Sequence, residues 1–233
     1  MSVVLAFDCA VSGLGVAVLR DGAVLASLRE EGREQAARLL PAIAAAMEQA
    51  GVERRALSLI AVTTGPGSFT GVRVGLAAAR GLAMALDVPL AGIATTTVLL
   101  SQAAASANTE GRLVVAVLDS HLGDWFCAIR AGAQALSESA QAPFLAATAD
   151  LAVRLAGQPC LIVGPEAAAL APLLPNAQPQ VALPDPSILA RLAFEEGVES
   201  WRIRNRTEGL PRPLYLRGVN ITLPDGARRT VDG

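Results

Sequence analysis

The chain has 233 residues, a formal net charge of −2 and 52% hydrophobic residues, enough to build the core of one or two folded domains. All 19 basic residues are Arg and there is one His, which excludes a P-loop lysine, Lys Schiff-base chemistry and a paired-His metal site within one chain. Aromatic residues make up only 3% of the chain, so few rings are available for stacking on bases.

The three cysteines are widely spaced and lie in apolar runs, which predicts reduced, buried thiols rather than disulfides or a metal cluster. The first residues have no basic start and lead directly into Asp8, unlike a signal peptide, so we expect a cytoplasmic protein. We expect no membrane-spanning segment, because Arg73, Arg80 and Asp87 interrupt the longest apolar stretch.

Three short strands and a helix open the predicted fold. A continuous apolar run and two alternating segments around a tight turn give the strands, at residues 3–8, 14–20 and 23–29. Apolar residues then recur at helical spacing from Glu34 to Ala50, with Gly51 as a plausible stop. Pro41 within this helix indicates a kink or a late start.

A glycine-rich loop joins the next strand to a second helix. The loop, Gly65-Pro66-Gly67-Ser68-Phe69-Thr70-Gly71-Val72-Arg73, follows a buried strand at 57–63 and leads into a helix from Thr70 to Leu86. A short strand, a third helix and a polar break complete this half, at residues 90–93, 96–106 and 106–111.

The opening pattern then returns, which predicts an internal duplication. An apolar run at 113–118 ends in Asp119, as the first run ends in Asp8. Strands are predicted on both sides of Gly132, at residues 124–130 and 133–139. Later elements are a helix, a strand, a Pro-rich stretch and a helix, at residues 148–156, 160–163, 172–186 and 187–196.

Duplicated strand-strand-strand-helix units are typical of an actin-like fold. We therefore predict an α/β, actin-like fold of the ASKHA, ribonuclease H-like class with two lobes, at residues 1–106 and 107–217. Residues 199–233 hold seven Arg against four acidic residues, and residues 218–233 are predicted to be a flexible basic tail. The segment Trp201-Arg202-Ile203-Arg204-Asn205-Arg206 is either a phosphate contact or part of a solvated tail.

Two interpretations of the glycine-rich loop stay open. Its glycines permit a sharp turn after a strand, and Ser68 or Thr70 can cap the following helix, whose first amides would bind an anion. The alternative is a tight, capped connection without a ligand. Arg73 in the first helical turn opposes the helix dipole, so it either contacts an acidic group or points to solvent.

The turn after the first strand is a second candidate site. Asp8 followed by a Gly-containing turn is where actin-like ATPases hold metal and phosphate, although Cys9 replaces the usual Gly. The matching turn after Asp119 carries His121, which has either a catalytic role or none. The candidate anion or nucleotide contacts are Asp8, Ser12, Gly67, Ser68, Thr70 and Arg73.

Both helices of the first lobe carry more apolar surface than one core face needs. Small residues permit close helix approach, so this surface is a candidate partner interface, with burial inside the lobe as the alternative. The predicted interface residues are Leu39, Ile43, Met47, Gly75, Ala78, Ala79 and Leu82, with Ala85 on the same helix.

From about residue 5 to 217 the chain resembles the TsaB (YeaZ) family. The most specific matching segment is the loop at 65–73. The supporting segments are Leu5-Ala6-Phe7-Asp8-Cys9-Ala10, Asp119-Ser120-His121-Leu122-Gly123-Asp124-Trp125-Phe126 and Pro213-Leu214-Tyr215-Leu216-Arg217.

The resemblance implies a non-catalytic subunit for tRNA modification. It implies a partner subunit that binds TsaD, with TsaE as a further ATPase component, for threonylcarbamoyl transfer to the adenosine next to the anticodon of tRNAs reading ANN codons. It also implies a homodimer in isolation, no cofactor of its own, ATP or ADP at the complex interface, and tRNA reached only through the complex. TsaD-like enzymes carry an H-x-x-x-H metal pair on a first-lobe helix, whereas this helix has Gln35 and Leu39 there, and many relatives have His at the position of Gln35.

Two other functions compete with this interpretation. One is an actin-like ATPase or metallopeptidase-like enzyme acting alone, against which the missing Lys, the lack of a His pair and Cys9 all weigh. The other is a tRNA-binding module that uses the basic tail.

Overall fold

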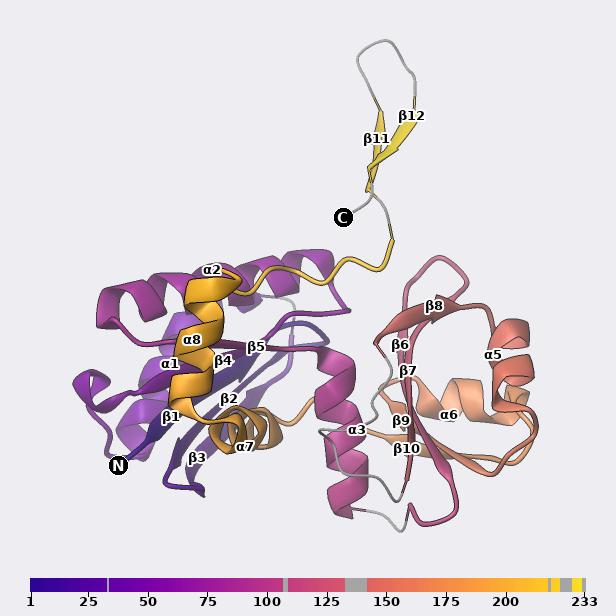
Figure 1. Ribbon diagram of the computed structural model, residues 1–233, viewed down its shortest axis with the longest axis horizontal. Helices are drawn as coiled ribbons and strands as arrows, with labels where there is room; N and C mark the ends of the chain where they lie inside the picture. Colours follow the sequence, from indigo (N-terminus) through magenta and orange to yellow (C-terminus); the bar gives the residue numbers. More distant parts are fainter. Residues whose placement is uncertain (33, 107–108, 133–141, 218, 223–227, 232–233) are drawn as a thin grey trace.

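The computed structural model describes residues 1–32, 34–106, 109–132, 142–217, 219–222 and 228–231. Each of two lobes is built on a five-stranded mixed sheet, and the lobes lie side by side with a helix between them (Figure 1). The third strand predicted for the second half, at 133–139, lies outside the described residues, as do positions 107 and 108 of the predicted polar break.

The first sheet has the strand order β3-β2-β1-β4-β5. Its strands are β1 (Val3–Asp8), β2 (Leu14–Arg20), β3 (Ala23–Glu30), β4 (Leu59–Thr63) and β5 (Leu90–Ile93). β1 pairs with β2 antiparallel and with β4 parallel, which makes it the centre of the sheet. All six residues of β1 are buried because helices cover both faces of the sheet, which explains the continuous apolar run.

The second sheet repeats this order as β8-β7-β6-β9-β10. Its strands are β6 (Leu113–Asp119), β7 (Trp125–Ala131), β8 (Phe144–Ala146), β9 (Cys160–Gly164) and β10 (Ala177–Val181). β6 takes the place of β1, since it pairs antiparallel with β7 and parallel with β9. The predicted duplication and the two-lobe, actin-like α/β fold are thus confirmed.

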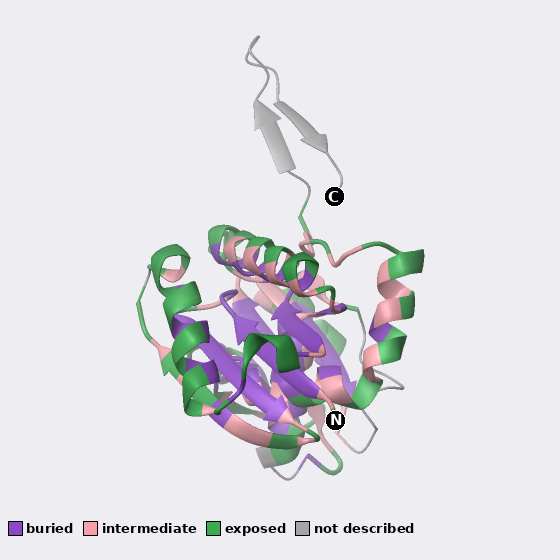
Figure 2. Ribbon diagram, turned by 90° about the vertical axis from the view of Figure 1, so that its left-hand side faces the viewer, coloured by how far each residue is buried: buried purple, intermediate pink, exposed green. Residues whose placement is uncertain are grey.

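Long helices cover the outer face of the first sheet and short ones that of the second. On the first sheet these are α1 (Gln35–Gln49) and α2 (Phe69–Leu86), and the 3-10 turn η1 (Arg54–Ala56) lies between α1 and β4. On the second they are α5 (Thr148–Leu155) and α6 (Ala167–Leu170), followed by η2 (Ala171–Leu173). Figure 2 shows the buried strands inside the lobe and exposed residues on the outer sides of the helices.

The lobes exchange the helices that cover their inner faces. α3 (Thr95–Ser106) follows the first sheet in sequence but packs on β6, β7 and β9 of the second sheet. α7 (Pro186–Glu196) follows the second sheet and packs on β1, β2 and β4 of the first. The predicted boundary at residues 106 and 107 therefore separates the two sheets, whereas the helices cross it in both directions.

The segment at 201–206, for which a phosphate contact and a solvated tail were the two alternatives, belongs to a packed helix, α8 (Val198–Thr207). Trp201 is buried and its indole N–H donates to the Ala193 carbonyl at 3.0 Å. The Asn205 side chain bonds both backbone groups of Leu90 on the edge strand β5. These residues fasten α7 and α8 to the first sheet, so the basic composition of this segment does not make it a free tail.

Two further strands lie near the C-terminus. β11 (Val219–Thr222) and β12 (Arg228–Val231) pair antiparallel and project away from both lobes (Figure 1). The Pro-rich stretch predicted at 172–186 also contains a strand, β10, on the edge of the second sheet. Pro179 is tolerated there because an edge strand leaves one row of amides unpaired.

α2 is long and apolar enough, by length and composition alone, to cross a membrane, although it contains Arg73 and Arg80. One of its faces packs on the sheet, and its buried residues are Gly71, Val72, Gly75, Leu76, Ala79 and Ala83. This arrangement is that of a core helix with one outward face.

The second lobe buries a charged side chain in its inner layer. Arg130 on β7 is 2% exposed, and burial lowers the pKa of its guanidinium. Among the described residues, its Nη2 donates a long hydrogen bond of 3.4 Å to the Leu100 carbonyl on α3. We find no physical reason in the described residues for a charge at this position.

Candidate functional site

An apolar groove lies between α1 and α2 on the outside of the first lobe. Its volume is about 790 Å³. Seven apolar side chains of the two helices line it: Leu40, Ile43, Ala44, Met47, Leu82, Ala85 and Leu86. Leu40 is 56% exposed beside it, and Met84 on α2 is 75% exposed. An apolar surface of this kind on a folded protein is typical of a site for another chain.

The predicted partner interface overlaps this groove but is out of register with it. Leu39, Ile43 and Met47 are at most 6% exposed and belong to the core of the lobe. Gly75 and Ala79 are also buried, because they face the sheet under α2. Leu39, Gly75 and Ala79 are therefore corrected to core positions, whereas Ile43 and Met47 are core residues that also line the groove. Ala78 and Leu82 are half-buried and keep an outward side.

The outward stripe lies one residue along the helix from the predicted one. Leu40 and Ala44 follow Leu39 and Ile43, and both are exposed. A helix with apolar residues at consecutive positions has a stripe wider than one core face requires. That width is in the sequence, but which edge faces the sheet depends on how the helix is rotated.

The glycine-rich loop is pressed against the turn that follows β1. A Cβ on Gly67 would lie 2.0 Å from the Ala10 carbonyl oxygen, and one on Gly71 would lie 1.9 Å from that of Cys9. The Ser68 N–H donates to Ala10 O at 2.7 Å, and Ser68 Oγ accepts from the Gly71 N–H at 3.2 Å. The chain itself thus fills the space that a phosphate cradle would need around these amides.

Asp8 is enclosed in the same contact. It is 1% exposed, and its Oδ1 accepts from the Thr63 hydroxyl at 2.6 Å and from the Ala10 N–H at 3.0 Å. Burial raises the pKa of this carboxyl, and the two hydrogen bonds partly oppose the rise. The adjacent Cys9 thiol has its pKa raised to about 12, chiefly by burial, so it is not a nucleophile.

The six predicted anion contacts therefore do not form one site. Asp8 is inside the lobe, and the Ala10 backbone occupies the side of Gly67 where a Cβ would lie. The other four residues, Ser12, Ser68, Thr70 and Arg73, are exposed. Of the two open interpretations of the loop, the geometry favours the tight, capped connection.

The matching turn of the second lobe is open to solvent. His121 has a positive φ of 61°, its N–H donates to Asp119 Oδ1 at 2.7 Å, and its Nδ1 lies 3.2 Å from Asp119 Oδ2. Behind the turn, burial raises the pKa of the Glu166 carboxyl, against hydrogen bonds from backbone amides. Glu166 Oε2 has no hydrogen-bond partner in the described residues.

A short C-terminal segment, residues 209–217, crosses from the first lobe to the second; we call it the strap. It is fixed to α2 by hydrogen bonds from the Arg80 side chain to the Pro211 carbonyl, and to β4 by Leu214 N–H donating to Thr64 O at 2.8 Å. Its far end makes an ion pair between Arg217 and Asp124 of the second lobe.

The strap also brings Tyr215 onto the first turn of α2. Arg73 Nε donates to Tyr215 Oη at 2.9 Å, and the Arg73 guanidinium carbon lies 3.4 Å from the centre of the Phe69 ring. The two rings are 6.0 Å apart. Arg73 was expected either to contact an acidic group or to point to solvent. It is exposed, and its side chain contacts two aromatic rings rather than an acidic group. The rarity of aromatic residues in the sequence was the signal for Phe69 and Tyr215.

These elements enclose a cleft of about 550 Å³ between the lobes. The loop after β4, the turn after β6 and the strap line it. Its lining includes Pro66, Ser68, Phe69, Thr70, Val72, Asp119, Ser120, His121, Phe126, Leu214, Tyr215 and Arg217.

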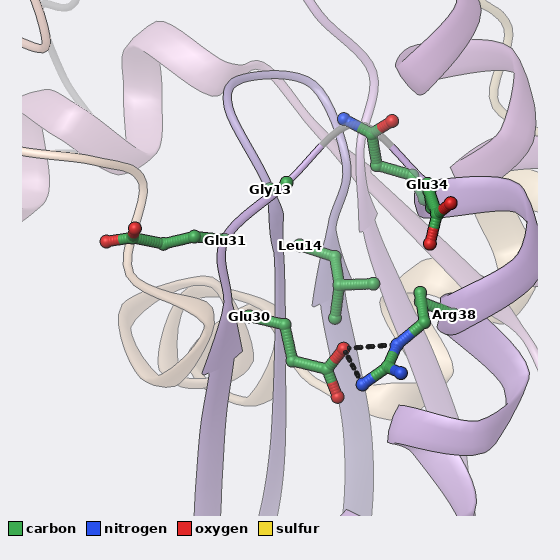
Figure 3. Close-up of a pocket in the computed structure, with 8 residues that line it drawn as sticks. Gly13, Leu14, Glu30, Glu31, Glu34 and Arg38 are labelled. Atoms are coloured by element: carbon green, nitrogen blue, oxygen red, sulfur yellow. Dashed lines mark hydrogen bonds and ion pairs between the residues drawn. The ribbon is translucent and has the colours of Figure 1, made fainter.

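A further, acidic pocket lies where α1 begins. Gly13, Leu14, Glu30, Glu31, Glu34 and Gln35 line it with Arg38. Figure 3 shows Glu30 and Arg38 pointing toward one another in an ion pair of 2.8 Å, while Glu31 points away. Among the described residues no three His, Cys, Asp or Glu side chains are placed to hold a metal ion.

Comparison with known proteins indicates which family this chain resembles. The TsaD family model, described as tRNA N6-adenosine threonylcarbamoyltransferase, matches residues 29–121, which include α1, α2 and the turn at His121. The solved structure of YeaZ from Pseudomonas aeruginosa superposes with a TM-score of 0.75 and 28% identity, over 93% of this chain and all of that one.

Two curated relatives share the name tRNA threonylcarbamoyladenosine biosynthesis protein TsaB. The Escherichia coli protein is 34% identical over 54% of this chain and 53% of its own length. The Bacillus subtilis protein is 31% identical over 52% of this chain and 51% of its own. These matches support an assignment to the TsaB/YeaZ family. The matched part spans about half the length of these curated relatives.

The similarity to TsaB/YeaZ proteins agrees with the residues quoted for that family in the sequence. The loop at 65–73 lies within the segment that the TsaD family model matches, as do both helices of the groove. The strap lies outside that segment, so its contacts with the loop are seen only in the structure.

Proposed function

We propose that the chain is a partner subunit in tRNA threonylcarbamoyladenosine biosynthesis that binds a TsaD-type enzyme through the groove between α1 and α2. The observation that carries the proposal is this apolar groove with its exposed Leu40, on helices inside the segment that resembles TsaD. Related chains that share such helices can pair through them about a pseudo-twofold axis, burying both apolar stripes. The names of the relatives support a role in tRNA threonylcarbamoyladenosine biosynthesis.

The proposed role is support of the enzyme rather than catalysis. The transferred group is threonylcarbamoyl, and its acceptor is the adenosine beside the anticodon of tRNAs that read ANN codons. The chain has one His and no Lys, and Gln35 and Leu39 stand where the enzyme family carries its metal pair, which supports placing the chemistry on TsaD. Asp8 and Cys9, the candidates nearest an active-site position, are buried.

The proposal extends to partners and ligands. TsaE joins the complex, tRNA is reached through it, and the same groove makes a homodimer when TsaD is missing. The chain holds no cofactor of its own, and ATP or ADP binds at the interface within a cytoplasmic complex. Tight, Mg-dependent ATP binding with turnover by the isolated chain would contradict this and favour the enzyme alternative.

Leu82→Arg tests the groove. A guanidinium in an apolar interface leaves a desolvated charge without a partner, so we expect TsaD binding to weaken about 100-fold, as measured by calorimetry. The homodimer should dissociate as well, which light scattering measures. Threonylcarbamoyl transfer reconstituted with TsaC, TsaD and TsaE should fall in parallel.

Val153→Arg is the matched control, because Val153 is 80% exposed on α5 of the other lobe and lies away from the groove. It should leave TsaD affinity and transfer unchanged. Native TsaD affinity of the Leu82→Arg protein would rule out the groove as the interface.

A further inference from the structure

Side-chain types that are rare in this sequence meet in the cleft between the lobes. The single Tyr and the single His of the chain, Tyr215 and His121, line it together with Phe69 and Phe126. Phe69 is 52% exposed, although aromatic side chains make up only 3% of the chain and Phe is among the residues most often buried. A ring exposed at the edge of a cleft of about 550 Å³ is placed to contact a ligand.

Arg73 places a positive charge beside these rings. Its guanidinium lies over Phe69 and donates to Tyr215 Oη, and in the described residues no carboxylate forms an ion pair with it. An Arg held by aromatic faces keeps its full charge and has donors left for an anion. The rings fix the direction of the side chain, so little conformational entropy remains to be lost on binding.

The carboxylates on the opposite wall are already paired. Asp119 contacts His121, and Asp124 contacts Arg217. The hydroxyl groups of Ser68 and Thr70 line the wall that carries Phe69. The first-lobe side of the cleft therefore offers hydroxyl and aromatic groups to a ligand, and the Arg73 cation lies beside the rings.

We propose that the cluster Phe69, Arg73 and Tyr215 binds one nucleotide of single-stranded RNA, its base against the rings and its phosphate on Arg73. Stacking on aromatic side chains beside a cation is how proteins hold unpaired nucleotides without reading their sequence. An acidic protein segment would satisfy Arg73 but would leave the exposed ring of Phe69 without a planar partner. This inference rests on the proposed function, because that function supplies tRNA as the RNA, and it goes beyond that function by giving this chain a direct contact with the tRNA.

The test uses the full chain and a labelled, unstructured RNA of about nine nucleotides, with affinity measured by fluorescence anisotropy between about 50 and 200 mM salt. Arg73→Gln should weaken binding about tenfold and make the slope of log affinity against log salt shallower by about 0.7. Phe69→Leu keeps an apolar side chain without the ring, and should weaken binding about tenfold with an unchanged slope.

Arg191→Gln is the matched control. Arg191 is exposed on α7, forms no ion pair within the described residues and does not line the cleft. Thermal unfolding of each variant verifies its fold. Absence of RNA binding by the native chain, or equal affinities for the two cluster variants and the control, would overturn the proposal.

Poly-glutamate separates the two kinds of partner. If it displaces RNA as well as unlabelled RNA does, and depends on Arg73 but not on Phe69, the site is for an acidic protein and the RNA proposal fails. Both cluster variants should retain TsaD affinity, while Leu82→Arg should retain RNA affinity. If the proposed function is wrong, the Leu82→Arg protein keeps its native TsaD affinity. That result does not change the RNA measurements, so the two proposals fail separately.

Discussion

The two lobes have the same strand order but differ in what covers their outer faces. α1 and α2 of the first lobe run for 15 and 18 residues, whereas α5 and α6 of the second run for 8 and 4. Long helices have a second side left over once their core face is buried, and that side forms the groove. The short helices of the second lobe have little surface to spare.

The turns after the central strands differ in the opposite sense. In the first lobe Asp8 is enclosed by the glycine-rich loop, while in the second Asp119 and His121 face solvent at the cleft. The duplicated fold has thus enclosed the turn after the central strand in one lobe and left the matching turn of the other lobe open. The difference lies in the connections rather than in the sheets, because the strands pair identically.

The largest effect should come from filling the contact that closes the first lobe. A Cβ at Gly71 would lie 1.9 Å from the Cys9 carbonyl oxygen, and backbone cannot move aside as a flexible side chain can. Gly71→Ala should therefore lower the free energy of unfolding by about 3 kcal/mol or more. Urea unfolding followed by circular dichroism measures this.

Gly81→Ala, on the same helix, is the matched control for Gly71→Ala. No atom lies within 4 Å of the Cβ it would add, so better helix propensity should raise stability by about 0.5 to 1 kcal/mol. If the two substitutions had similar effects, the contact between the loop and the turn would not be what closes the lobe.

The sequence predicted the sheets because their signals are local. The apolar runs at 3–8 and 113–118, each ending in Asp, predicted the duplication that the strand orders confirm. The buried, free state of the three cysteines also agreed. α8 was missed because its buried side is essentially Trp201 alone, so its polar surface resembled a tail.

The candidate site was less predictable because it depends on long-range contacts. Only the rotation of α1 about its axis decides that Leu39 is core and Leu40 is surface. Phe69 and Tyr215 are far apart in the sequence, and only the path of the strap brings them together. The exchange of α3 and α7 between the lobes was likewise hidden, since each helix follows its own sheet in sequence.

A smaller effect concerns the dependence of protein stability on pH, which should differ between variants of Asp8 and Asp119. Burial raises the pKa of Asp8 in the folded state, so the folded protein holds this proton more tightly than the unfolded chain does. The contribution to stability is full below the ordinary value of 3.8 and is lost as the pH rises through the folded pKa. Asp8→Asn removes the ionisation and keeps an acceptor for Thr63 and Ala10.

We therefore expect the stability of Asp8→Asn to fall less steeply than that of the native chain between about pH 4 and pH 8. Urea unfolding at a series of pH values measures the slopes. Asp119→Asn, in the open turn, should change stability by less than about 1 kcal/mol. Parallel pH curves for the native chain and Asp8→Asn would contradict the enclosure of Asp8.

The smallest effect concerns what holds the unlike lobes together. Arg217 of the strap pairs with Asp124 of the second lobe, but their side chains are 41% and 23% exposed, so water screens the attraction. A double-mutant cycle with Arg217→Ala and Asp124→Ala should give a coupling of about 0.5 kcal/mol, lost in about 1 M salt.

A weak coupling follows from the exchange of helices. α3 buries Leu99 and Leu100 against the second sheet, and α7 buries Leu189 against the first, so apolar packing already joins the lobes. At about 25 cal/mol per Å² of apolar surface, these contacts exceed one exposed ion pair several-fold. A salt-resistant coupling above about 2 kcal/mol would contradict this and make the strap a principal link between the lobes.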